Sequence, residues 1–271
     1  MKNRSPMRIF SALVAGWLLT GAAAPEPARA EARTNLTVDY QIALGGFDFG
    51  RADIRAEIGG DAYTLDALIK TEGIAEQFFE TSFALESRGA FSGTRVKPAR
   101  FVSTYTDPDS SRRVELTYPG TGIPTMQAEP AYADGFGPNI HQNDLLMTQD
   151  PISALLLPAT GTSPCNRSLP LFDGRRRYDL RLKPDGEAEM NGPDDAYKGT
   201  VLRCSVDMIP VAGYERKTLI KLLEREDSIR VWLAPVDDGR VWVPVRLTLR
   251  TPFGGAVMRA TRFEATLAAA P

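Results

Sequence analysis

Few side chains in this sequence could do chemistry, and His141 is the first to consider. It is the only histidine in 271 residues, so a hydrolase with an imidazole base would have to use it. It lies in the polar run Pro138-Asn139-Ile140-His141-Gln142-Asn143, which is typical of a surface loop, and no Gly-X-Ser-X-Gly motif supplies a nucleophile. Zinc would need more His and Cys ligands than the chain has. We therefore predict no catalytic residue, no metal site and no cofactor.

Carboxylates gather at three points of the chain, each beside glycine or proline: Asp107-Pro108-Asp109, Asp194-Asp195 and Asp237-Asp238. Their spacing does not match a calcium-binding loop, so we predict that they form turns. A carboxylate pair for glycosidic cleavage would be a spatial arrangement, and the sequence singles out none.

The run Arg175-Arg176-Arg177 follows Asp173-Gly174, a dipeptide typical of a hairpin turn. In a strand that begins at Arg176, this residue would share the side of Tyr178, Leu180 and Leu182. An arginine so placed needs a carboxylate, carbonyl groups or an anionic ligand headgroup. Arg176 is thus a candidate ligand-binding residue, and the alternative is a structural ion pair.

The first thirty residues determine where this chemistry would take place. Lys2, Arg4 and Arg8 precede the apolar run Ile9–Ala24, and Ala28-Arg29-Ala30 has small residues at both cleavage-determining positions. We predict a cleavable signal peptide over 1–30 and a soluble periplasmic protein that begins at Glu31. The alternative is a retained anchor, but the apolar run is shorter than the roughly 20 residues that a spanning helix needs. Charged residues interrupt every later apolar run, so no stable membrane span is expected after cleavage.

Composition narrows the choice of partners. The whole chain has a formal net charge of −2, and the predicted leader contains more cations than anions, so the remainder is more acidic still. A basic surface for phosphate backbones is not expected, which excludes nucleic acid as a partner. Residues 31–271 suffice for one buried core, and we predict a single domain.

The two cysteines are Cys165 and Cys204. Disulfides persist in the compartment to which the leader would send them, so we predict that they bond to each other. The alternative, a redox-active pair, lacks the Cys-X-X-Cys spacing that tunes thiol acidity.

Alternation of apolar and polar residues predicts strands along almost the whole chain after the leader. So many consecutive antiparallel strands must curl or close, and we predict a mainly β fold, either a single curved sheet or a partial β-barrel. The predicted strands are Leu36–Leu44, Ala52–Ile58, Tyr63–Ile69, Phe83–Arg88, Val96–Thr106, Arg113–Tyr118, Arg176–Lys183, Gly199–Ile209, Ile229–Ala234, Val241–Arg250 and Ala256–Leu267.

Two apolar segments interrupt the strands and could cover such a sheet. Gln149–Leu157 has Asp150 as an N-cap and Pro151 at the first helical position, which predicts a short apolar helix. Gly73–Glu80 fits one or two helical turns or an apolar loop, and Thr218–Glu226 fits either a helix or a strand. The candidate ligand-binding residues from these segments are Phe78, Phe79, Ile152, Leu155 and Leu156. The alternative is that they are core.

Three stretches resemble an exported bacterial family catalogued as domain of unknown function 3108. They are Asp150-Pro151-Ile152-Ser153-Ala154-Leu155-Leu156, then Phe172-Asp173-Gly174-Arg175-Arg176-Arg177-Tyr178-Asp179-Leu180, and lastly Val231-Trp232-Leu233-Ala234 with Val243-Pro244-Val245-Arg246 and Thr251-Pro252-Phe253-Gly254. The resemblance covers about Leu36 to Leu267. It implies a curved antiparallel fold similar to that of periplasmic lipoprotein carriers, and no activity.

These observations favour a non-enzymatic periplasmic protein that binds or carries a lipid-like or apolar small molecule. The alternative is a structural or interaction module of the cell envelope, with an envelope protein as its partner. A hydrolase that uses His141 is third.

Overall fold

The computed structural model describes residues 33–73, 75–78, 80–133, 139–159, 161–193, 196–214, 228–252 and 254–268. These residues belong to one compact unit, Glu31–Pro271. The predicted signal peptide, Phe79 and the ambiguous segment Thr218–Glu226 lie outside the described residues.

The first half of the unit is a meander of antiparallel strands. Side chains alternate along each strand, so Leu36, Val38 and Tyr40 are buried on one face of β1 while their neighbours face outward. The meander predicted from Leu36 to Ile69 is confirmed. The strands are β1 (Arg33–Leu44), β2 (Phe47–Gly59), β3 (Ala62–Thr71), β4 (Ser82–Ser92), β5 (Arg95–Thr106), β6 (Ser111–Thr117) and β7 (Thr125–Glu129).

The second half contains the remaining strands and three short 3-10 turns. Val241, Val243 and Val245 of β13 are buried, as their alternation predicts. The strands are β8 (Leu157–Pro158), β9 (Arg167–Phe172), β10 (Arg177–Asn191), β11 (Lys198–Ala212), β12 (Ile229–Val236), β13 (Val241–Thr251) and β14 (Gly254–Ala268). The turns are η1 (Gln142–Leu145), η2 (Ser153–Leu155) and η3 (Asp237–Gly239).

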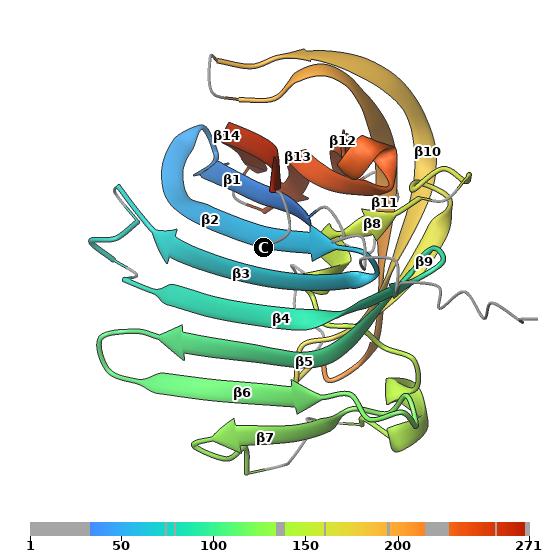
Figure 1. Cartoon of the computed structure of the whole chain (residues 1–271). Helices are drawn as coiled ribbons and strands as arrows, with labels where there is room; N and C mark the ends of the chain where they lie inside the picture. Colours follow the sequence, from blue (N-terminus) through green and yellow to red (C-terminus); the bar gives the residue numbers. More distant parts are fainter. Residues whose placement is uncertain are drawn as a thin grey trace, which may run out of the picture. The chain divides into compact units, whose positions relative to one another are not determined.

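All fourteen strands among the described residues belong to one sheet. Its order is β7-β6-β5-β4-β3-β2-β1-β14-β13-β12-β11-β10-β9, and β8 pairs with β13 beside this path. The first and last strands therefore lie next to each other in the middle of the sheet, where Arg33 pairs with Ala268 (Figure 1). The edge strands β7 and β9 come from the middle of the chain. This result confirms the predicted mainly β, curved antiparallel fold.

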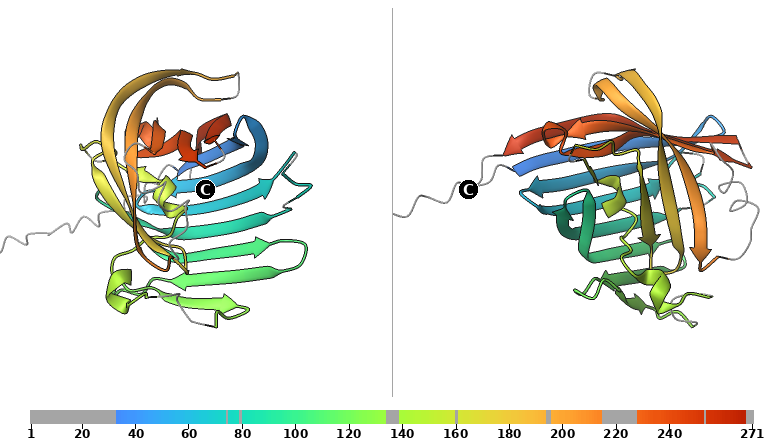
Figure 2. Two further views of the ribbon diagram at one scale, coloured as in Figure 1. Left: turned by 180° about the vertical axis from the view of Figure 1, so that it is seen from behind. Right: turned by 90° about the vertical axis from the view of Figure 1, so that its right-hand side faces the viewer.

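The sheet bends until its two edges approach each other. In Figure 2, right, β9 to β11 run across the direction of β2 to β6. Arg167 Nη1 at the start of β9 donates to the Thr94 carbonyl in the β4–β5 turn, at 3.0 Å. Gly174, in the turn after β9, has a φ of +93°, and a Cβ there would lie 2.5 Å from Val114 Cγ1 of β6. Glycine allows this turn to pack against the opposite part of the sheet.

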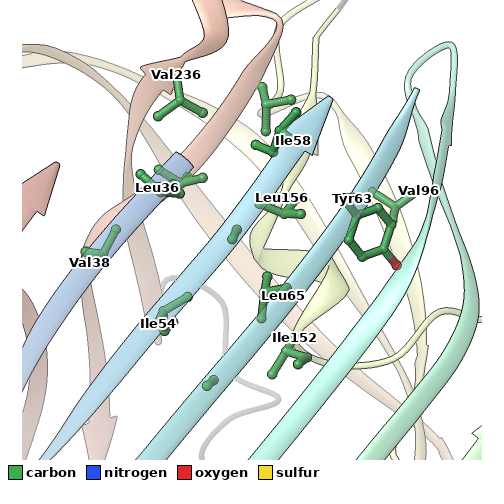
Figure 3. Close-up of a cluster of buried hydrophobic side chains, with 14 of the residues drawn as sticks. Leu36, Val38, Ile54, Ile58, Tyr63, Leu65, Val96, Ile152, Leu156 and Val236 are labelled. Atoms are coloured by element: carbon green, nitrogen blue, oxygen red, sulfur yellow. The ribbon is translucent and has the colours of Figure 1, made fainter. Parts of the chain in front are cut away.

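Aliphatic side chains from both halves fill the space inside the bend. Figure 3 shows Ile152 and Leu156 among side chains of β1, β2 and β3, with Val236 from the second half nearby. Ile152 is 4% exposed and Leu156 is 1% exposed. The segment between β7 and β9 therefore fills the bend, and its apolar residues hold the two halves of the sheet together.

The predicted disulfide is confirmed, because Cys165 and Cys204 are bonded with their Cα atoms 5.4 Å apart. It joins the loop before β9 to the middle of β11. For a separation of 39 residues, chain entropy predicts a stabilisation of roughly 4 kcal/mol.

The helix predicted over Gln149–Leu157 is wrong in its extent. Only Ser153–Leu155 forms a 3-10 turn, and Leu157 and Pro158 pair with Trp242 and Val241 of β13. Pairing with the sheet satisfies backbone groups that a longer helix would have bonded within itself. In Gly73–Glu80 the described residues form turns, and β7, β8 and β9 were not predicted.

Candidate functional site

The Asp150 carboxyl group anchors the segment that fills the bend. It is fully buried, and its Oδ1 accepts hydrogen bonds from the backbone N–H groups of Ile152 (3.1 Å) and Ser153 (2.8 Å). Ser87 Oγ of β4 donates to its Oδ2 at 2.8 Å. Asp150 thus satisfies two backbone donors at the start of the η2 turn and ties the turn to β4, although the N-cap position belongs to Ile152 and not, as predicted, to Asp150. Burial raises its pKa to about 6.

The predicted ligand-binding residues do not come together at one place. Ile152 and Leu156 are buried, Leu155 is half-buried, and Phe78 is 71% exposed at a turn between β3 and β4. Phe79 lies outside the described residues. Of the described candidates, only Leu156 also lines the pocket described below.

Arg176 lies in the turn before β10 and not in the strand, which begins at Arg177. Its side chain is exposed, and its Nη1 lies 3.7 Å from Asp173 Oδ2. The buried arginine is its neighbour Arg177, whose Nε donates to the Asp144 carbonyl at 2.7 Å and whose Nη1 pairs with Asp179 at 2.6 Å. The buried position therefore belongs to Arg177, because the pairing of β10 with β11 shifts between Arg177 and Tyr178 and so interrupts the alternation on which the prediction relied.

A pocket of about 530 Å³ opens where the bent sheet does not close. Residues 95–98 of β5 pair with β4 on one side, whereas β6 reaches β5 only as far as Arg100. Residues 166–170, which include most of edge strand β9, line the opposite wall. We call this space the edge pocket. The pocket lies here because β6 stops pairing with β5 at Arg100, which leaves residues 95–98 without a partner in β6.

The inner wall of the edge pocket is largely aliphatic. Val96 projects from β5 and is buried, and Leu156 and Leu157 come from the segment that fills the bend. Met147 and Leu169 also belong to the apolar lining. Met147 has a φ of +59°, in the left-handed region that non-glycine residues seldom adopt. Such strain is common at ligand sites, where surrounding contacts hold a residue in place.

Two side-chain polar atoms of lining residues are fully buried, so that they do not face the open pocket, and have no hydrogen-bond partner among the described residues. They are Tyr118 Oη, just after β6, and Gln149 Nε2. The Gln149 backbone is fixed, because its N–H donates to Pro170 (2.9 Å) and its carbonyl accepts from Phe172 N–H (3.0 Å) of β9. Burial raises the pKa of Tyr118 well above its usual value, so its hydroxyl stays protonated.

The charged residues that line the edge pocket are all cations: Arg95, Lys97 and Arg167. No acidic side chain in the described part of the chain forms an ion pair with them. Burial lowers the pKa of Arg167, whose guanidinium donates to the Thr94 carbonyl. Arg95 and Lys97 are exposed, whereas the charged groups that act on the buried Tyr118 hydroxyl are the carboxylates of Asp150 and Asp173.

Sequence reasoning missed Tyr118, Gln149 and these three cations as site residues. Tyr118 was predicted to end a strand, yet nothing in its local pattern marks its hydroxyl as buried. The pocket depends on β9, whose Pro170 weakens the strand signal. Pro170 fits this strand because β9 lies at the edge of the sheet. The sequence alone does not show which strand lies at an edge.

The remaining polar candidates take part in hydrogen bonds of local turns. His141 is exposed, and its backbone N–H donates to Asp144 Oδ2 at 2.9 Å. Asp107 Oδ1 accepts from the N–H groups of Asp109 (2.9 Å) and Ser110 (2.7 Å), which confirms the predicted turn. Across the described ranges, no three His, Cys, Asp or Glu side chains are grouped so that they could hold a metal ion.

Comparison with known proteins identifies the family. A model of the family described as "Protein of unknown function (DUF3108)" matches residues 39–261. The chain belongs to this family. The DUF3108 match runs from β1 to β14 and so includes every residue of the edge pocket, and it confirms the resemblance found in the sequence. No curated protein matches the chain.

One similar solved structure is the β-barrel-like protein of domain of unknown function DUF1849 from Brucella abortus. The sequences are 10% identical, the TM-score is 0.48, and the similarity covers 88% of this chain and 99% of that one. Within the residues described for this DUF3108 protein, no helix has the length and apolar character needed to cross a bilayer.

Proposed function

We propose that this protein is a non-enzymatic binding protein of the periplasm that holds a lipid-like or other largely apolar small molecule in the edge pocket. The observation that supports the proposal most directly is the pocket itself. Its volume of about 530 Å³ falls within the range of about 300–1,000 Å³ that is usual for small-molecule sites. Its aliphatic inner wall is of the kind that such sites use to hold apolar groups, and the rest of its lining is polar.

The periplasmic location is supported by two independent features. The first thirty residues have the charge, apolar run and small residues of a cleavable export signal. The bond between Cys165 and Cys204 is of a kind that persists in oxidising compartments.

The test begins with protein purified from the envelope of cells that express the full chain. We expect native mass spectrometry to show a bound species of several hundred daltons that organic extraction removes, and the extracted protein to bind an alkyl ligand again. The variant Ser168→Trp should lose both properties, because Ser168 is exposed on β9 and lines the edge pocket, where an indole would occupy the space.

Thr266→Trp is the matched control, since Thr266 is exposed on β14 and does not line the pocket. This variant should bind as the natural protein does. A natural protein that contains no ligand and binds none after extraction would contradict the proposal, as would equal binding by Ser168→Trp.

A second candidate function, an interaction module of the envelope, is favoured by one observation. Phe47 and Phe78 are 70% and 71% exposed; Phe47 is the first residue of β2, and Phe78 lies in the β3–β4 connection. Exposed aromatic side chains are common in protein interfaces. A photo-crosslinking residue at position 78 that traps a single envelope protein, in cells whose edge pocket is blocked by Ser168→Trp, would support this candidate.

A further inference from the structure

A row of cations crosses the outer face of the sheet, away from the edge pocket. Residues that lie directly opposite each other on neighbouring strands share one face of a sheet, so the pairing register defines such a row from β11 to β3. Its members, in order across the strands, are Arg203, Trp232, Arg246, Arg259, Gln41, Arg51 and Lys70. The chain is acidic overall, yet its fold gathers basic side chains in this line.

The row faces away from the core. Arg246 follows Val245, which is 1% exposed, and Arg259 precedes the buried Ala260. Since side chains alternate along a strand, the cations point outward where these neighbours point inward. The row crosses the middle of the sheet, where β14 pairs with β1 (Figure 1).

Carboxylates compensate the cations near the two ends of the row. Arg203 lies at one end and Arg51 lies near the other, and both form ion pairs. The contacts of the surrounding carboxylates are Asp185 with Arg203 (2.8 Å) and Arg230 (3.3 Å), Asp53 (3.5 Å) and Glu72 with Arg51, Asp39 with Arg262 (3.9 Å), and Asp48 with the Gln41 amide (2.7 Å).

The centre of the row is not compensated in this way. Arg246, Arg259 and Lys70 form no ion pair with any acidic side chain in the described part of the chain. Arg259 Nε donates to Gln41 Oε1 at 3.1 Å, and the Arg246 guanidinium stacks 5.0 Å from the centre of the Trp232 ring. Arg246 and Arg259 are direct cross-strand partners, and like charges so placed destabilise a sheet. The stability of the fold therefore does not explain this pair.

The extent of the row indicates what would cover it. Four strand spacings separate Arg246 from Lys70, which is about 19 Å at about 4.8 Å for each spacing. A single phosphate could bridge one pair of cations, whereas a surface with many phosphate groups could contact the whole line. Trp232 is half-buried beside Arg246, and tryptophan is common where a protein meets the polar surface of a bilayer.

We propose that this outer face docks on a membrane surface that contains anionic phospholipids, with Arg246 and Arg259 as the main contacts and Lys70 as a third. Basic side chains near such a surface each add to the attraction, and the contact needs no spanning segment. The docking goes beyond the proposed function, because it does not use the edge pocket. It would bring a protein that holds apolar molecules to the membranes that contain them.

Co-sedimentation with vesicles tests the docking on protein purified from the envelope. One set of vesicles contains phosphatidylcholine alone, and the other contains equal parts of phosphatidylcholine and phosphatidylglycerol. We expect the anionic vesicles to bind at least tenfold more tightly at low salt. This preference should shrink as salt is added, because ions screen exposed charges.

Substitutions of the central pair test its role. Each cation near an anionic surface contributes about fivefold to affinity, so Arg259→Gln alone should weaken binding to anionic vesicles about fivefold. Arg246→Gln combined with Arg259→Gln should weaken it about 25-fold. Arg246→Lys combined with Arg259→Lys keeps both charges and should restore most of the binding. Arg259 is exposed, so its single variant should fold even if a change at Arg246 disturbs the packing on Trp232.

The matched control combines Arg55→Gln with Arg181→Gln. Both arginines are exposed on strands of the same sheet, and each lies directly opposite a carboxylate, Asp66 for Arg55 and Asp207 for Arg181. The control changes the net charge by the same amount as the central double variant. Because neither residue belongs to the row, it should bind anionic vesicles as the natural protein does.

The outcomes are separate from those of the proposed function. Equal binding to both kinds of vesicle, unchanged binding in the central glutamine variant, or an equal loss in the control would overturn the docking. Binding of polyglutamate without binding of vesicles would also overturn it, in favour of an acidic protein partner. Ser168→Trp should bind vesicles as the natural protein does, so an empty edge pocket would leave this inference standing.

Discussion

Asp150 is buried with hydrogen-bond donors around it and no ion-pair partner among the described residues. Burial raises its pKa from 3.8 to about 6, so the folded state binds a proton more tightly than the unfolded state does. The free energy of unfolding should therefore fall as the pH rises from about 4 to about 6, by roughly 3 kcal/mol from this group, and then level off. The buried Asp150 carboxylate therefore lowers the stability of the folded protein at neutral pH, at the point where the segment between β7 and β9 contacts β4.

The substitution Asp150→Asn should remove this pH dependence. Its amide oxygen can accept the N–H groups of Ile152 and Ser153, and its amide nitrogen can donate to Ser87 Oγ, so the turn stays anchored. Urea unfolding between pH 4 and pH 7.5 should show the variant up to about 3 kcal/mol more stable at neutral pH, with the difference vanishing near pH 4.

The control for that measurement is Asp150→Ala, which leaves the two buried N–H groups without an acceptor. It should be less stable than Asp150→Asn at every pH, by about 1–3 kcal/mol for each group. A difference between Asp150→Asn and the natural protein that does not change with pH would contradict the raised pKa.

At the scale of elements, strands with strict alternation could be predicted from sequence and strands at the edges could not. Strand β1 could be predicted because one of its faces belongs to the core, which requires the alternating apolar residues Leu36, Val38 and Tyr40. Arg167-Ser-Leu-Pro-Leu-Phe of β9 has a proline and a weak pattern, since this strand has a full partner on one side only. Gln149–Leu157 has helix-like caps, but its last residues pair with β13, a tertiary interaction that no local pattern reveals.

The candidate site was predictable only in part for the same reason. Leu156 could be chosen from its apolar neighbours, and it does line the edge pocket. Tyr118, Gln149 and Arg167 meet there because β6 ends early and β9 approaches β5 across the bend. Contacts between residues so distant in the chain leave no periodic signal in the sequence.

The disulfide is an element-scale constraint whose strength can be measured. Cys165→Ser combined with Cys204→Ser should lower the free energy of unfolding by roughly 4 kcal/mol, because the unfolded chain regains the freedom of the closed loop. Urea unfolding of the variant, and of the natural protein with and without a reductant, measures this loss. If the reductant destabilises the double variant as much as the natural protein, the effect does not come from this bond.

At the scale of the whole molecule, the predicted leader leads to one expectation and the sheet to another. We expect the exported protein to begin at Glu31, directly after Ala28-Arg29-Ala30. Amino-terminal sequencing of the protein from a periplasmic extract tests this expectation, with Ala30→Leu as the variant in which cleavage should slow. Full-length protein retained in the cytoplasm would contradict it.

The pairing of β1 with β14 also affects when the protein can fold. Strand β14 is synthesised long after β1, and until the two pair, β1 has an open edge at the centre of the sheet. A sheet that depends on pairing between the two ends of the chain forms slowly, since loop closure must precede those contacts. We therefore expect the complete sheet to form only after β14 has been synthesised, which would suit the proposed export of an unfolded chain.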